Sequence, residues 1–117
     1  MNDVFLWSFD QYQRLAMRTC PDLGKPADHK QPVAAMTAVL GLCGESGEVA
    51  ELYKKFHEQH RDFTRQQLIS ELGDCLWYLA RIASVEGIEL SEIAEANIAK
   101  LQARYPNGFV PGGGIRE

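Results

Sequence analysis

The sequence has little of several features that would assign it to particular protein classes. It has 3 cysteines, an odd number without metal-ligand spacing, so reduced thiols are expected rather than a disulfide framework. A formal net charge of −4 provides no basic excess for general binding to nucleic acid or membrane surfaces. We see no signal-peptide pattern and expect no run of membrane-spanning length. The expectation is a cytoplasmic protein without nucleic-acid or membrane partners.

The chain is also short. Its 117 residues fit one domain, spanning residues 1–117, and a domain of this size buries only about two thirds of its unfolded surface when alone. Association between copies would therefore help it. Cys43 and Cys75 are expected to pack as small thiols in the core.

Capping signals and apolar spacing predict helices, and no strand pattern competes with them. Ser8 with Gln11, and Thr64 with Gln67, have the spacing of capping boxes. Pro32 suits the first turn of a helix. These signals, with apolar residues recurring every three to four positions, predict an all-α chain with an irregular tail at 106–117 and helices at about 8–19, 32–57, 64–86 and 91–104.

Two pairs of acids stand out, Glu45 with Glu48 and Glu71 with Asp74. Residues three apart on a helix share a face, and in both pairs that face also carries the apolar residues of its helix. A carboxylate among apolar residues is costly unless it is paired, protonated or bound to a metal. Capping or salt bridging is the alternative to a metal. Two matched pairs favour the metal.

The chemistry of the four acids indicates which metal. An oxygen-only set suits Mg²⁺, with Mn²⁺ as a substitute, and lacks the thiolates or imidazoles expected for zinc. Because Mg²⁺ is commonly completed by substrate phosphates, a nucleotide substrate fits better than a permanent structural ion.

Basic and amide side chains of the last predicted helix are candidates for phosphate binding. Asn97, Lys100 and Arg104 fall on one helical face. Arginine offers paired donors to phosphate, and lysine a point charge. Salt bridges to the four acids are the alternative role for this face. Lys55, in line with Glu48, is a further phosphate candidate.

Glycines occupy positions 41, 44, 47 and 73 inside the two predicted helices that carry the acids. Each interior glycine lowers the stability of its helix by about 1 kcal/mol. Close approach of another helix, a metal or a phosphate would offset that cost. A helix contact alone explains them almost as well.

Three runs of sequence resemble the MazG-like all-α nucleoside triphosphate pyrophosphohydrolases: GLCGESGEVAELYKK, ELGDCLWYLARIA and EANIAKLQARYPNGF, with DQYQRLAMRT as a weaker match. The resemblance implies that Glu45, Glu48, Glu71 and Asp74 bind metal and act in catalysis. Lys100 and Arg104 would be the basic pair that binds phosphate. The departure is Gly44, which replaces the first of two adjacent glutamates in the family pattern.

The resemblance implies a four-helix-type bundle completed by dimerisation, either a dimer or a tetramer built as a dimer of dimers. It also implies Mg²⁺-dependent hydrolysis of ribo- or deoxynucleoside triphosphates to the monophosphate and pyrophosphate, in house-cleaning or control of nucleotide pools. The alternative from another class is a non-catalytic helical module that assembles or binds nucleotide for regulation.

Two other metal sites are disfavoured. His57 and His60 are three residues apart, whereas a zinc-protease helix has its histidines four apart. A ferritin-like di-iron site needs a histidine three residues after a glutamate, and neither acidic pair has one.

Trp77 falls outside the apolar arc of its helix, which suggests a subunit interface or a base pocket.

Overall fold

The computed structural model describes residues 8–21 and 28–112. Within these ranges there is no strand, only an isolated bridge between Pro106 and Gly108. The chain forms four helices there, α1 (Phe9–Met17), α2 (Pro32–Gln59), α3 (Arg65–Val85) and α4 (Leu90–Arg104). The all-α prediction is confirmed.

The predicted helix ends lie within two residues of the observed ones. Both capping boxes form: the Ser8 hydroxyl accepts from the Gln11 amide at 3.1 Å, and the Thr64 hydroxyl accepts from the Gln67 amide at 3.1 Å. Each glutamine side chain accepts in return from the backbone of its partner. Local sequence alone therefore determines where α1 and α3 begin.

The corner between α3 and α4 depends on Gly87. This residue adopts a φ of 68°, a left-handed conformation that glycine tolerates best. The Ile88 amide then donates to the Ala83 carbonyl oxygen at 2.8 Å, closing the end of α3. The chain leaves this corner in a new direction and enters α4.

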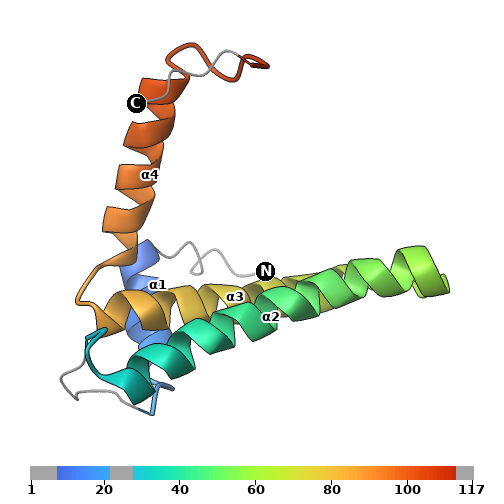
Figure 1. The fold of residues 1–117 in the computed structure, drawn as a ribbon, viewed down its shortest axis with the longest axis horizontal. Coiled ribbons are helices and arrows are strands. Elements are labelled where there is room, and N and C mark those ends of the chain that lie inside the picture. The colour runs from blue at the N-terminus through green and yellow to red at the C-terminus, as the bar shows by residue number, and fades with distance from the viewer. Residues whose placement is uncertain (1–7, 22–27, 113–117) are drawn as a thin grey trace.

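Figure 1 shows α2 and α3 running side by side as one long arm, with α1 packed against α3 near the end where α4 starts. Helix α4 projects away from this arm (Figure 1) and contacts α1 at its base. The Cα radius of gyration is 17.3 Å, compared with about 13 Å for a compact chain of this length. The single chain is therefore open.

The core is correspondingly small. It is built from Met17, Ala80, Ala83 and Leu90. Trp77 packs against this core, and its Nε1 donates to the Ala16 carbonyl oxygen at 3.0 Å and to the Thr19 hydroxyl at 2.9 Å. The indole N–H thus joins α3 to the end of α1, and the role of the half-buried ring in a subunit interface or base pocket stays a prediction.

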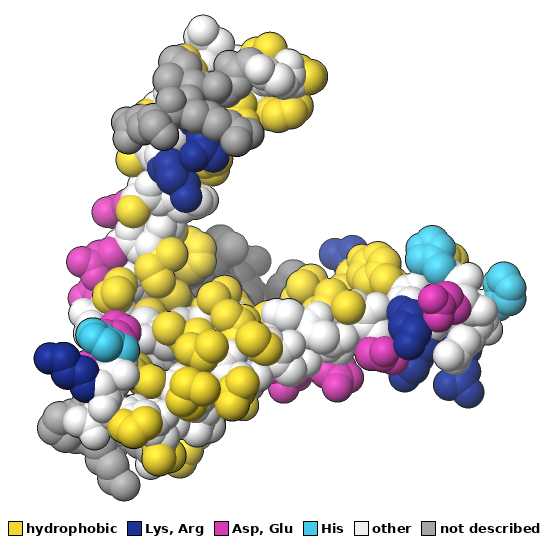
Figure 2. All heavy atoms as spheres, in the orientation of Figure 1, with side chains coloured by type: hydrophobic (Ala, Val, Ile, Leu, Met, Phe, Trp, Pro, Cys, Tyr) yellow, Lys and Arg dark blue, Asp and Glu magenta, His cyan; other side chains and the backbone are white. Residues whose placement is uncertain are grey.

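Much of the apolar surface is exposed. Figure 2 shows hydrophobic side chains gathered over the first half of α2 and the base of α4. Val33 is 81 % exposed and Leu40 60 % exposed, and α4 exposes Ile93 and Ile98. Cys43 is exposed and Cys75 half-buried, so the expectation that both are core residues is wrong within one chain.

Helix α2 also corrects the expectation about long apolar runs. Among the described residues it is the one helix long and apolar enough to cross a membrane, with an 18-residue mean hydropathy of 1.2. This is weak evidence, because the core helix of a soluble protein can have the same length and composition. Any such stretch of α2 with at most two charged residues contains Glu45 and Glu48. Their carboxylates would be costly in lipid.

Candidate metal centre

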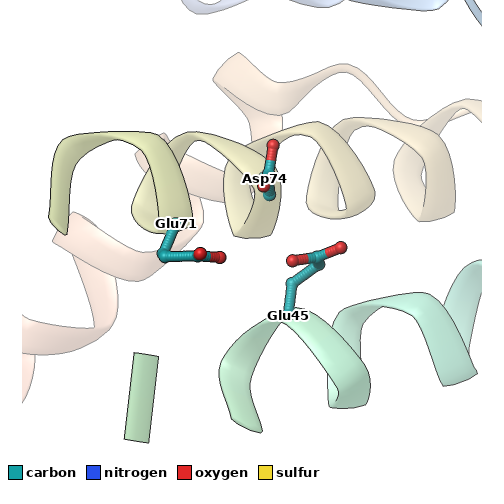
Figure 3. Close-up of side chains that lie close together, drawn as sticks. All are labelled: Glu45, Glu71 and Asp74. Atoms are coloured by element: carbon teal, nitrogen blue, oxygen red, sulfur yellow. The ribbon is translucent and has the colours of Figure 1, made fainter. Parts of the chain in front are cut away.

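Three of the four predicted acids meet between the middle of α2 and the first half of α3. Carboxylate oxygens of Glu45, Glu71 and Asp74 all lie within 4.8 Å of one another. Figure 3 shows Glu45 reaching from α2 toward α3, which carries the other two. Residues far apart in the sequence thus form one group, as the matched spacing predicts.

The close packing of α2 on α3 explains how the acids meet. The ring of Tyr78 lies against Gly41, where a methyl group would collide with it. Gly41 lies four residues before Glu45, and Tyr78 four residues after Asp74, so this contact is about one turn from the acids. The glycine lets the two helices approach just beside the carboxylates.

Burial and the neighbouring acids both act on the carboxyl of Glu45. Partial burial raises the pKa of its carboxyl above the ordinary value of 4.5, and the charges of Asp74, Glu71 and Glu48 raise it further, in that order of size. A group that releases its proton reluctantly among other carboxylates is stabilised when a cation arrives.

Glu48 lies outside the trio of mutually close oxygens but near enough to act on Glu45 electrostatically. It is exposed on α2. The structure therefore separates the four predicted acids into three that share one point and one at its edge.

Salt bridging does not account for these acids within the described chain. The ion pairs found there join His29 to Glu86, and Glu51 to Lys54 and Lys55. None of them involves the acidic group. Three carboxylates that converge with no ion pair to a basic side chain among the described residues fit the oxygen-ligand preference of Mg²⁺ or Mn²⁺.

The predicted phosphate-binding residues lie elsewhere in the single chain. Asn97, Lys100 and Arg104 are on α4, which projects away from the α2–α3 arm (Figure 1). Asn97 and Lys100 are exposed and Arg104 is half-buried. Lys55 lies near the C-terminal end of α2, where its Nζ is 3.8 Å from Glu51 Oε2. The structure thus brings the acids together and leaves the cations separate.

The remaining helical glycines face open space. A methyl group at Gly44, Gly47 or Gly73 would meet nothing within 4 Å. Helix contact in one chain therefore explains Gly41 and leaves these three without an internal reason.

Tyr12 on α1 was missed by the sequence analysis. Burial raises the pKa of its phenol, and the charge of Asp74 raises it further. Helix α1 thus brings a hydroxyl within electrostatic reach of the acidic group. No pattern in the sequence indicates this, because the approach of α1 to α3 is a tertiary contact.

The fold and this site define a class: an all-α protein with a carboxylate centre suited to a divalent cation. A family model described as the MazG nucleotide pyrophosphohydrolase domain matches residues 34–109, well over half of the chain. The chain belongs to this family. Its members are generally nucleoside triphosphate pyrophosphohydrolases and typically depend on divalent metal, which supports a hydrolase.

Among curated proteins, the chain is 37 % identical to the Gene 37 protein of Mycobacterium phage L5 over 79 residues. The match covers 64 % of this chain and 69 % of the phage protein, whose name states no activity. No solved structure matches.

Proposed function

We propose that the protein is a Mg²⁺-dependent hydrolase that converts ribo- or deoxynucleoside triphosphates to the monophosphate and pyrophosphate. The observation that carries this proposal is the convergence of Glu45, Glu71 and Asp74 within a chain of the MazG family. Control or cleaning of cytoplasmic nucleotide pools is the role that fits such a reaction.

Each acid has a proposed part in the reaction. Glu45, Glu71 and Asp74 would hold Mg²⁺ or Mn²⁺. The ion supplies Lewis acidity, because it neutralises phosphate charge and lowers the pKa of water. We assign to Glu48, whose charge acts on Glu45 from the edge of the trio, the role of taking a proton from the attacking water. The water oxygen bonds to the α-phosphorus while the bond to the bridging oxygen breaks, and pyrophosphate leaves.

The experiment is pyrophosphate release from a panel of nucleoside triphosphates with Mg²⁺ or Mn²⁺. We expect Glu45→Gln to lower kcat/KM by about a hundredfold or more, because the variant loses a carboxylate that would help to stabilise the charge developing in the transition state. Glu51→Gln is the matched control, since Glu51 is on the same helix but lies outside the acidic trio and forms ion pairs with Lys54 and Lys55. A folded, metal-binding protein that releases no pyrophosphate from any nucleotide would favour the non-catalytic module.

We also propose that the working form is a homo-oligomer, a dimer or a tetramer built as a dimer of dimers. The chain exposes 9078 Å², whereas a compact monomer of 13.1 kDa exposes about 6,400 Å². If each copy buried this excess of about 2,700 Å², a dimer would bury about 5,400 Å² in total, at the upper end of the range of obligate interfaces. Light scattering that finds only monomer at micromolar concentration would contradict this.

The opposite charges of α4 and of the α2–α3 arm suggest how two copies would pack. Helix α4 carries Lys100 and Arg104 beside exposed apolar residues, and the α2–α3 arm carries the acids beside exposed apolar residues. We propose that α4 of one copy packs on the arm of another, so that cations and acids from two chains form each site. The three open glycines would then be places where the partner or the triphosphate approaches.

A further inference from the structure

Within one chain, helix α4 is held at one end. It starts beside α1 and then projects away, so the described chain has few contacts to fix its direction beyond that base. Lys100 lies ten residues from the first residue of α4, a distance of about 15 Å along the axis. A tilt of about 10° at the base would therefore move this lysine by about 3 Å.

Gln13 of α1 holds the corner from which α4 starts. Its amide Nε2 donates to the Ser84 hydroxyl and to the Ile88 carbonyl oxygen, both at 3.0 Å. Its Oε1 accepts from the Leu90 amide at 2.8 Å. One buried side chain, 8 % exposed, thus bonds the end of α3, the turn and the first residue of α4.

Asp10, one turn earlier on α1, holds the next residue of α4. Its two carboxylate oxygens accept from the Ser91 amide at 3.1 Å and the Ser91 hydroxyl at 2.7 Å. These bonds lower the pKa of Asp10, so it remains an ionised acceptor. A negative charge at the N-terminus of a helix also interacts favourably with the helix dipole.

We infer that Asp10 and Gln13 form a clamp that sets the direction of α4 and thereby positions Lys100 and Arg104 for the triphosphate. The two clamp residues lie on α1, before the matched residues 34–109. They touch neither the acids nor the basic pair in these contacts and act through the direction of a helix. The phosphate part of this inference rests on the proposed function.

The test compares wild type with Gln13→Met, which keeps the length of the side chain but removes three hydrogen bonds, and with Asp10→Asn, a milder change. Gln66→Met is the matched control, because Gln66 is exposed on α3. Hydrogen exchange of the α4 amides reports the clamp without requiring activity. Steady-state kinetics and Mn²⁺ titration report the site.

In both clamp variants we expect faster exchange along α4, by about tenfold in Gln13→Met. We expect KM for the triphosphate to rise about tenfold while kcat changes less than about twofold, because the basic pair binds phosphates alike in the ground and transition states. Mn²⁺ affinity should stay unchanged, since the acids are on α2 and α3. The control should match wild type.

Unchanged α4 exchange in both variants would overturn the clamp. Faster exchange with unchanged KM would overturn its positioning role. If Gln13→Met does not fold, Asp10→Asn and Ser84→Ala, which removes one acceptor, decide the same question. If wild type hydrolyses no nucleotide, the proposed function fails separately. The clamp is then judged by α4 exchange and by Mn²⁺-dependent affinity for tripolyphosphate, which must fall in the variants.

Discussion

The ring of Tyr78 on α3 occupies the space that a side chain at position 41 of α2 would need. Gly41 therefore serves the approach of two helices, whereas Gly47 on the same helix faces open space. We predict that Gly41→Ala lowers the free energy of unfolding by about 1–3 kcal/mol through overpacking. Gly47→Ala meets nothing within 4 Å in the described chain, so in a single chain it should raise this free energy by up to about 1 kcal/mol through helix propensity. Urea unfolding measures the free energy of unfolding of both variants, and the same change in both would contradict the prediction.

The split between the trio and Glu48 predicts two kinds of variant. Asp74→Asn should weaken Mn²⁺ binding by about tenfold or more and reduce turnover with it, because a proposed ligand loses its charge. Glu48→Gln should bind Mn²⁺ nearly as well as wild type while kcat falls by about a hundredfold or more. Calorimetry and pyrophosphate release measure the two quantities. Turnover retained in both folded variants would remove these acids from the mechanism.

Much of this was predictable from local sequence. The capping residues Ser8 and Thr64 predict the helix starts, and spacing of three predicts that Glu71 and Asp74 share a face. The direction of α4 was not predictable, because it follows from the turn at Gly87 and the contacts of Gln13, which join residues more than 70 positions apart. Exposure of Cys43 was missed for a related reason, since an apolar pattern does not say whether another part of the same chain packs on that face.

A site shared between chains predicts complementation. A Glu45→Gln chain keeps its α4 cations, and a chain with Lys100→Ala and Arg104→Ala keeps its acids. At subsaturating triphosphate each variant alone should release little pyrophosphate, the first because its acidic group is defective and the second because its KM is raised. Mixed oligomers, formed by refolding the two together, should regain pyrophosphate release at one kind of site. The control is a mixture of Glu45→Gln with Asp74→Asn, both defective in the acidic group, which should remain inactive. No recovery in confirmed mixed oligomers would place cations and acids in the same chain.

His29 links the segment before α2 to the end of α3. Its Nδ1 lies 3.0 Å from Glu86, and this hydrogen bond and charge raise the pKa of His29 above 6.5. The ion pair therefore contributes stability that is fully present below pH 6.5 and is lost as pH rises through the raised pKa. Proton NMR of wild type should show the raised pKa, and Glu86→Gln should return it toward 6.5. A His29 titration that is identical in both proteins would contradict this.

The Trp77 indole predicts coupling between α3 and the end of α1. Trp77→Phe removes the donor to Ala16 and Thr19, and should lower the free energy of unfolding by about 1–2 kcal/mol. A double-mutant cycle with Thr19→Val isolates the bond between the two side chains. Thermal unfolding in the four proteins should be non-additive, whereas strict additivity would mean that this bond contributes nothing.

The small core has a consequence for how the protein folds. In the described ranges the buried apolar residues are Met17, Leu90 and a few alanines, so a single chain has little to stabilise it if it assembles as proposed. Folding and assembly would then be one reaction, with a melting temperature that rises with protein concentration. At low expression, unassembled chains would be open to proteolysis, and catalytic capacity would fall more steeply than the amount of protein made.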